Sequence, residues 1–90
     1  MKKRLMEILA CPICKHHPLE LRAFRGGEEI EEGLLTCPGC GRWYPIIEAI
    51  PHMLPDELRE EQEDREFLSR WKGEIPDSVL RSGKPHNLGQ

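Results

Sequence analysis

The hydrophobic positions at the N-terminal end of the chain follow a helical period. Leu5, Ile8 and Leu9 are spaced at i, i+3 and i+4, which places them on one face of an α-helix. Three basic residues precede them and suit a solvated first turn. We therefore expect a short helix within residues 1–10 whose apolar face packs on the core.

The period then changes to two, which is typical of a half-buried strand. Apolar and polar side chains alternate over residues 19–23, and residues 33–36 predict a second strand. Between them, Gly26 and Gly27 supply the positive φ angles of a tight reversal. The glutamates within residues 28–32 are expected to form a solvated edge. Together these segments predict a β-hairpin.

The most apolar segment of the chain spans residues 43–54 and predicts a third strand. Pro45 and Pro51 cannot donate to a ladder, which favours the edge of a sheet. A domain of this size has trouble burying both faces of such a strand, and an exposed apolar patch usually marks a partner site. The alternative, in which the whole segment is core, stays open. The side chains expected to face inward are Tyr44, Ile46 and Ile50, and those left over are Trp43, Ile47 and Met53.

The last third of the chain is polar and predicts a helix followed by a tail. An acidic helix is expected over residues 56–73, with its middle solvated. Near its end, Phe67 lies four residues before Trp71, so the two aromatic side chains share one face. Within the tail, residues 74–90, one more helical turn is expected over residues 75–80, and residues 81–90 are expected to be extended and disordered unless a partner holds them.

The cysteines of the chain form two C-x-x-C pairs, within residues 11–14 and 37–40, that are separated by 22 residues. Each turn of this kind aims two sulfur atoms at one point, and two turns complete a tetrahedron, as in structural zinc sites. Lys15 follows the first pair where Gly41 follows the second, so we expect the two turns to differ. Four thiolates close the coordination sphere and leave no open position for catalysis. The candidate metal ligands are Cys11, Cys14, Cys37 and Cys40.

Length and charge narrow the functional classes. Ninety residues with a formal net charge of −3 make one small domain, or a small domain with an appendage. Four thiolates and one zinc ion would lower the charge to about −5. That charge argues against direct binding to nucleic acid, which clustered Lys and Arg drive. The sequence holds no nucleophile elbow, phosphate-binding loop or dinucleotide fingerprint, so we expect no catalytic residues.

Cysteine usage and hydropathy point to a cytoplasmic protein without membrane contact. No stretch approaches the ~20 apolar residues of a membrane span, and the first ten residues are too charged for a signal peptide. A core with so few aromatic side chains needs a cross-link to be stable, and structural zinc contributes roughly 10–16 kcal/mol of apparent binding energy to folding. Disulfides are the alternative cross-link, but cysteine pairs in a reducing compartment bind metal.

Three segments, residues 5–14, 37–46 and 50–55, resemble a known family. It is the family of small zinc-binding activator subunits of methyltransferases that modify tRNA, rRNA and translation release factors, in the short archaeal or bacterial form. The most specific part is the second cysteine pair followed by residues 44–46 and then by Ile50 and Pro51. The resemblance covers about residues 1–55.

The resemblance implies a non-catalytic subunit that forms heterodimers with class I methyltransferases, more than one of them. The partner would hold S-adenosylmethionine, and tRNA or another substrate would be reached only through it. Binding would proceed by strand addition along residues 42–50 and by apolar contacts. The implied partner-binding residues are Arg42, Trp43, Tyr44, Ile46, Ile47, Ile50, Pro51, Met53, Phe67 and Trp71.

The expected fold is therefore α+β. It has a small zinc-ribbon-like domain in residues 1–55, built from a helix, a β-hairpin and a third strand. An acidic helix (56–73) and a tail (74–90) follow. Two other functions share the cysteine pattern. One is a zinc ribbon of the transcription or translation machinery that contacts nucleic acid, which the acidic charge disfavours. The other is a rubredoxin-like electron carrier with iron, which the missing first-pair glycine disfavours.

Overall fold

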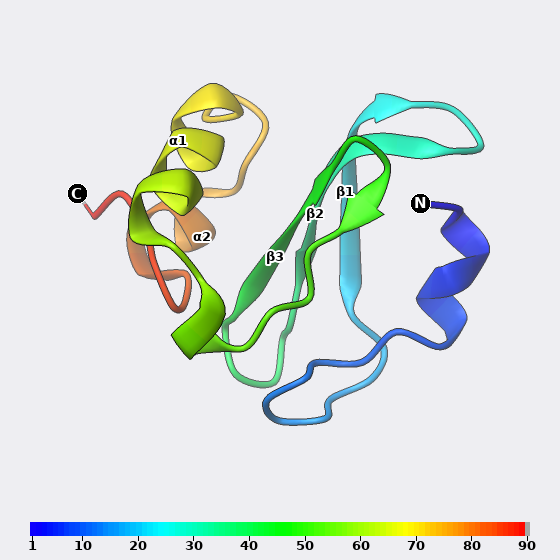
Figure 1. Cartoon of the computed structure of the whole chain (residues 1–90), viewed down its shortest axis with the longest axis horizontal. Coiled ribbons are helices and arrows are strands. Elements are labelled where there is room, and N and C mark those ends of the chain that lie inside the picture. Colours follow the sequence, from blue (N-terminus) through cyan, green and yellow to red (C-terminus); the bar gives the residue numbers. More distant parts are fainter. Residues whose placement is uncertain (90) are drawn as a thin grey trace.

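The computed structural model describes residues 1–89 and has one antiparallel sheet with helical segments on both faces (Figure 1). The strands are ordered β1-β2-β3-β4, so each pairs with the next along the chain. The expected α+β fold is confirmed. The elements are the 3₁₀ helix η1 (Lys3–Glu7), β1 (Glu20–Gly26), β2 (Ile30–Thr36), β3 (Trp43–Ile47), β4 (Ile50–Pro51), the 3₁₀ helix η2 (Asp56–Leu58), α1 (Glu61–Arg70) and α2 (Asp77–Ser82).

The predicted hairpin is confirmed as β1 and β2, with a reversal at Gly26, whose φ is 110°. One side chain in the turn region differs from the expectation. Glu32 is buried rather than solvated. It precedes Leu34 by two positions on β2 and therefore shares the face that the C-terminal helices cover.

Two apolar cores lie on opposite faces of the sheet. Trp43 of β3 belongs to one and Tyr44 to the other, as the alternation of a strand requires. Both faces are covered, so the expectation that Trp43 would be left exposed is wrong. Ile50, expected to face inward, is 60% exposed. The first core contains Met1, Cys11, Leu19, Ile30, Leu35, Cys37, Tyr44 and Ile46, and the second contains Leu34, Trp43, Phe67, Leu68, Ile75, Val79 and Leu80.

The third strand lies inside the sheet only at its C-terminal end, where β4 pairs with Ile46 and Ile47, whereas Trp43 at its start lies at an edge of the four-stranded sheet. β3 pairs with β2 on one side and, through a reversal at Glu48 and Ala49, with the two-residue strand β4 on the other. Both turn residues have positive φ, 51° and 67°. The Pro45 carbonyl accepts the His52 N–H just beyond the end of β4 (2.9 Å). The nitrogen and the carbonyl of a strand residue face the same side, so the Pro45 nitrogen points away from β2. The missing N–H of Pro45 therefore removes no hydrogen bond between β2 and β3.

The C-terminal third is folded onto the sheet. The helix expected over residues 56–73 is interrupted, because Arg59 between η2 and α1 has an extended backbone (φ −87°, ψ 137°). The tail expected over residues 74–90 contains α2, which buries Val79 and Leu80. Apolar burial orders this segment although its composition is polar. How independently residues 1–55 fold stays a prediction.

The N-terminal helix is shorter than the periodicity predicts. It is a 3₁₀ helix that ends at Glu7, so Ile8 lies past its end and is 74% exposed. Leu5 and Leu9 are half-buried and pack against the first core as expected.

Candidate metal centre and partner surface

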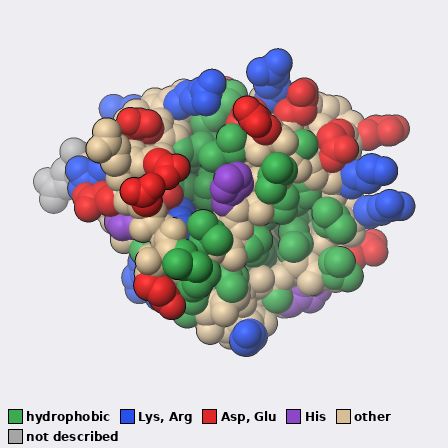
Figure 2. Space-filling model, in the orientation of Figure 1, with side chains coloured by type: hydrophobic (Ala, Val, Ile, Leu, Met, Phe, Trp, Pro, Cys, Tyr) green, Lys and Arg blue, Asp and Glu red, His purple; other side chains and the backbone are tan. Residues whose placement is uncertain are grey.

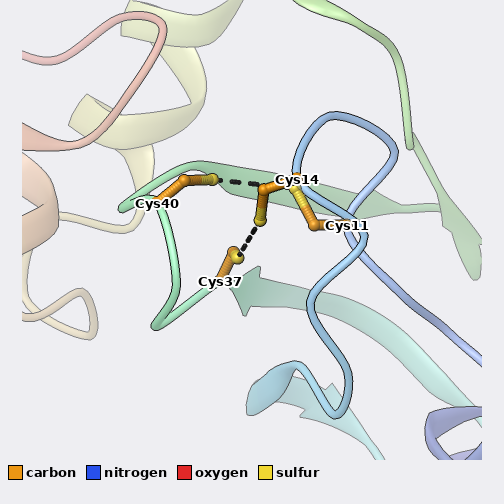
Figure 3. Close-up of side chains that lie close together, drawn as sticks. All are labelled: Cys11, Cys14, Cys37 and Cys40. Atoms are coloured by element: carbon orange, nitrogen blue, oxygen red, sulfur yellow. Dashed lines mark hydrogen bonds between the residues drawn. The ribbon is translucent and has the colours of Figure 1, made fainter.

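The four cysteine sulfur atoms lie close together between two loops of the chain (Figure 3). All lie within 4.8 Å of one another, with 3.7 Å between the Sγ atoms of Cys11 and Cys40 and 3.5 Å between those of Cys14 and Cys37. A tetrahedron with zinc–sulfur bonds of about 2.3 Å has edges of about 3.8 Å. All four side chains are free thiols. The set therefore fits one tetrahedral metal ion, as the spacing predicts.

The two cysteine loops have the same backbone geometry. The Lys15 N–H donates to the carbonyl of Cys11 over 2.9 Å, as the Gly41 N–H donates to the carbonyl of Cys37 over 2.9 Å. Lys15 has a φ of 67°, close to the 80° of Gly41. The expectation that the two turns differ is wrong. The lysine adopts the left-handed conformation because metal-site geometry requires it at this position, at a cost of about 1–2 kcal/mol.

Burial and neighbouring groups set the protonation of the cluster. Burial acts to raise the pKa of the Cys11 thiol. Hydrogen bonds from the backbone N–H groups of Cys14 and Ile13 and from the Tyr44 hydroxyl outweigh burial and lower this pKa to about 6. Burial raises the pKa of the Cys37 thiol to about 12, and the sulfurs of Cys14 and Cys40 act in the same direction. Four thiolates so close together repel one another, and a divalent cation supplies the charge that holds them deprotonated.

Two of the residues expected to contact a partner have contacts of their own near the metal loops. Tyr44 is fully buried, with its hydroxyl oxygen 3.2 Å from the Sγ of Cys11. Arg42 binds Asp56 through two bonds, Nε to Oδ1 (2.9 Å) and Nη2 to Oδ2 (2.8 Å). The Arg42 guanidinium holds the pKa of the Asp56 carboxyl below its usual range. This pair ties η2 to the second cysteine loop.

The remaining expected partner residues divide by exposure. In this conformation the buried ones are out of reach of a partner, because both faces of the sheet are covered. The partly or fully exposed ones stay predicted contacts. The buried side chains are Trp43, Ile46 and Phe67; Ile47, Pro51, Met53 and Trp71 are half-buried, and Ile50 is exposed.

An exposed apolar surface follows β3. Ile50 and Leu58 are each 60% exposed and Leu54 is 40% exposed. Leu54 and Leu58 also line a groove between the β3–β4 turn region and α1, together with Ile47 and Phe67. Figure 2 shows hydrophobic side chains gathered across the middle of this face, between charged flanks. The sequence interpretation named neither leucine as a partner contact: it placed Leu54 at the end of the apolar segment 43–54 and Leu58 in the helix expected over residues 56–73. We use the name apolar surface for the exposed side chains Ile50, Leu54 and Leu58 together with the groove residue Ile47.

The C-terminal strap, residues 59–88, occupies the outer edge of β3. The Trp43 N–H donates to the carbonyl of Lys84 (3.0 Å), and the Lys84 N–H donates to the carbonyl of Gly41 (3.1 Å). These bonds form a parallel bridge between Arg42 and Lys84. The Trp43 carbonyl accepts Nη1 of Arg59 (2.8 Å). The sequence interpretation expected this edge to be open, which is wrong for this conformation.

A polar cluster fixes the strap over Trp43. The Trp43 indole Nε1–H donates to the carbonyl of His86 (2.8 Å). Asp64 joins two parts of the strap, because its Oδ2 lies 3.0 Å from Nη2 of Arg59 and 2.7 Å from Nδ1 of His86. Arg59 and Asp64 are both buried. The strap is thus held by paired polar groups as well as by apolar contacts.

Within residues 1–89, none of the helices combines the length and the apolar character that crossing a membrane requires.

Comparison with known proteins relates the metal centre to a family. Residues 2–48, which contain all four cysteines, match the family model described as Trm112p-like protein. A UPF0434 protein of Nitrosococcus oceani is 36% identical over 67 residues, which are 74% of this chain and the whole of that protein. A UPF0434 protein of Methylobacillus flagellatus is 44% identical over 59 residues, covering 66% of this chain and 85% of that protein.

A solved structure is similar over much of the fold. It is a chain in a complex between the Haloferax volcanii Trm112 methyltransferase activator and a candidate methyltransferase. The match has a TM-score of 0.59 and 41% sequence identity, and it covers 64% of this chain and all of that chain.

Proposed function

Because this chain belongs to the Trm112p-like protein family, we propose that it is a non-catalytic activator subunit of class I S-adenosylmethionine-dependent methyltransferases. The observation that carries the proposal is the match to the Haloferax volcanii complex, whose chain is covered over its whole length at 41% identity. The partner would hold the methyl donor and the catalytic groups.

The metal in the four-cysteine centre is proposed to be structural zinc. Cys11, Cys14, Cys37 and Cys40 would hold it, and its chemistry is that of a closed tetrahedral clamp. The chain's own residues then do the positioning. The first loop is joined to η1 and the second leads directly into β3, so the clamp fixes β3 and the surface behind it relative to the N-terminal segment.

The partner is proposed to dock on the apolar surface that follows β3. Ile50, Leu54 and Leu58 expose large side chains that no described part of this chain covers. Such a patch on a small protein supports contact with an apolar surface of another protein. The methyltransferase would gain solubility from the contact, because its own apolar surface would be covered. Main-chain pairing along β3 is a second part of the proposed binding mode.

The substrates are proposed to be tRNA, rRNA or a release factor, reached only through the partner in the cytoplasm. The net charge of −3 supports an indirect role, because an acidic chain repels the phosphate backbone of RNA. One small subunit serving several methyltransferases fits a docking surface built from apolar side chains, which tolerate varied partners.

A pull-down followed by an activity assay tests the proposal. The tagged chain is expected to retain class I methyltransferases from the cells that produce it, identified by mass spectrometry. Each purified methyltransferase is then assayed for methyl transfer to tRNA, rRNA and release factor, with and without this chain. We expect the chain alone to transfer nothing and to raise the activity of its partner. If no methyltransferase is retained or stimulated, the proposed function is wrong.

Two matched variants locate the contact. Ile50→Asp is expected to abolish retention of the methyltransferase, because it places a charge in the apolar surface. Ile8→Asp changes an isoleucine that is more exposed (74% against 60%) but lies beside η1, and this variant is expected to bind normally. Zinc content close to one per chain should persist in both. Equal loss of binding in the two variants would move the interface elsewhere.

A further inference from the structure

We propose that the C-terminal strap is a displaceable cover of the partner-binding edge, so that a strand of the methyltransferase and the strap compete for β3. The inference rests on the proposed function and adds a regulation to it. The occupant that replaces the strap would be an extended segment of the class I methyltransferase, running parallel to β3 as the strap does at Lys84.

The strap bonds to the outer edge of β3 at Trp43, and residues 50–52 bond to the rest of that edge. Trp43 uses its N–H on Lys84 and its carbonyl on Arg59, and the Pro45 carbonyl accepts the His52 N–H. At the end of the strand, Ile47 pairs with Ile50. Main-chain pairing needs unpaired N–H and C=O groups, so a partner strand cannot add beside Trp43 while the strap is in place.

The strap pairs with the edge of β3 in the way an added strand would, but over a very short length. Within the described residues, its one β-bridge to this edge is the parallel bridge between Arg42 and Lys84. An extended parallel segment at the same place could bond to the Gly41 carbonyl and to both main-chain groups of Trp43, one main-chain bond more than the strap makes, because the strap reaches the Trp43 carbonyl only with the Arg59 side chain. The backbone there is therefore already shaped to accept a parallel segment, and the intramolecular segment is the weaker of the two.

The strap is also less firmly held than the sheet it covers. The metal centre joins the loop before β1 to the loop after β2, at the open end of the hairpin, whereas no cysteine lies after residue 40. The helices of the strap have ten and six residues, lengths that are marginal without tertiary packing. Segments of this kind open locally at lower free energy than a clamped core.

The comparisons are consistent with a strap that is not needed for binding a methyltransferase. The family model ends at residue 48, before the strap begins. The matched chain in the Haloferax volcanii complex corresponds to 64% of this chain, so about a third of this chain has no counterpart there. A strap that can leave makes the edge of this chain equivalent to that of the shorter protein.

Gly83 offers a way to open the strap without touching the sheet. A Cβ at this position would lie 2.8 Å from Cδ1 of Trp43 and 2.6 Å from the carbonyl oxygen of Val79, both too close. Gly83→Val therefore pushes the strap off the indole. Gly73→Val is the matched control, because a Cβ at Gly73 meets nothing within 4 Å. Lys84→Pro is a second opening variant, since it removes the N–H that bonds to Gly41.

Two measurements on the full-length chain test the inference. Hydrogen exchange of the Trp43 amide reports whether the strap has opened, and titration with the purified methyltransferase retained in the pull-down reports affinity. If the strap is closed in most molecules, the apparent dissociation constant equals the intrinsic one divided by the fraction of open molecules. Opening the strap should therefore tighten binding by about 10-fold or more. Gly83→Val and Lys84→Pro are expected to show both changes, and Gly73→Val neither.

Each other outcome has a definite meaning. Faster Trp43 exchange with unchanged or weaker affinity would overturn the inference and leave the proposed function standing, since wild type still binds. A strap that stays closed in both opening variants is not displaceable, and the inference is then wrong. If neither wild type nor any variant binds a methyltransferase, the proposed function fails as well.

Discussion

The guanidinium of Arg59 lies 4.6 Å from the centre of the Trp43 ring and donates Nη1 to the carbonyl of the same residue over 2.8 Å. One side chain thus binds both the face of the indole and the backbone of β3. Its other nitrogens approach Asp64, with Nη2 in an ion pair at 3.0 Å. Arg59 is therefore the joint between the metal-clamped sheet and the strap, and it explains why the backbone leaves the helical conformation there.

Replacing Arg59 should destabilise the strap more than any surface change. Arg59→Met would leave the Trp43 carbonyl without its donor and Asp64 buried with His86 as its remaining partner. We expect a loss of about 2–4 kcal/mol in the free energy of unfolding, the range for breaking a buried charge pair. Urea denaturation of the metal-loaded protein measures it.

Arg65→Met is the control for this change. Arg65 pairs with Glu61 on the exposed face of α1, with both side chains more than half exposed. Such a pair contributes about 0.3–0.5 kcal/mol. If the two variants lost similar amounts of unfolding free energy, the contacts of Arg59 would stabilise the protein no more than those of an exposed arginine.

The Arg42–Asp56 pair should make stability fall in acid. Arg42 lowers the pKa of Asp56 in the folded protein below its ordinary value of about 3.9. The stabilisation is therefore complete above that value and is lost as pH falls through the lower, folded pKa. The difference in unfolding free energy between wild type and Asp56→Asn should shrink from pH 6 toward pH 3. An equal difference at pH 6 and at pH 3, measured by urea denaturation, would show that the ion pair does not stabilise the folded protein.

The local parts of this structure could be predicted from the sequence. Cys11 and Cys37 each begin a C-x-x-C pair, and metal geometry dictates the rest of the site. The reversal at Gly26 and the alternation on either side define the hairpin. In each case the controlling residues lie within a few positions of one another, so the pattern is readable without knowledge of the fold.

The sequence-based predictions that were wrong concern features that depend on contacts between distant segments of the chain. The break at Arg59 exists because its side chain reaches Trp43, 16 residues earlier. The order of residues 74–89 depends on a sheet face that the polar sequence does not reveal, since only Ile75, Val79 and Leu80 become fully buried there with Gly83. The left-handed conformation of Lys15 was missed because the metal loop imposes it against the preference of the residue.

Relieving the left-handed strain at the β3–β4 turn should stabilise the protein. Ala49 has a φ of 67°, which glycine adopts without a Cβ penalty. Ala49→Gly is expected to raise the free energy of unfolding by about 0.5–1 kcal/mol after the greater chain entropy of glycine is subtracted. Ala23→Gly, at a position of β1 where φ is not positive, should lower it by a similar amount. The same sign for both in thermal unfolding would contradict the strain at Ala49.

The Tyr44 hydroxyl should tune the metal without being required for folding. It lies 3.2 Å from the Sγ of Cys11 and donates to that sulfur when it is a thiolate. Tyr44→Phe keeps the buried ring and removes the donor, so metal affinity should fall by about 10–100-fold, as for other groups that support metal ligands. Cys37→Ser, which removes a ligand, should instead abolish stable folding. Competition with a zinc-chelating dye measures the affinity, and circular dichroism checks the fold. An unchanged affinity in Tyr44→Phe would show that the hydroxyl does not support the thiolate.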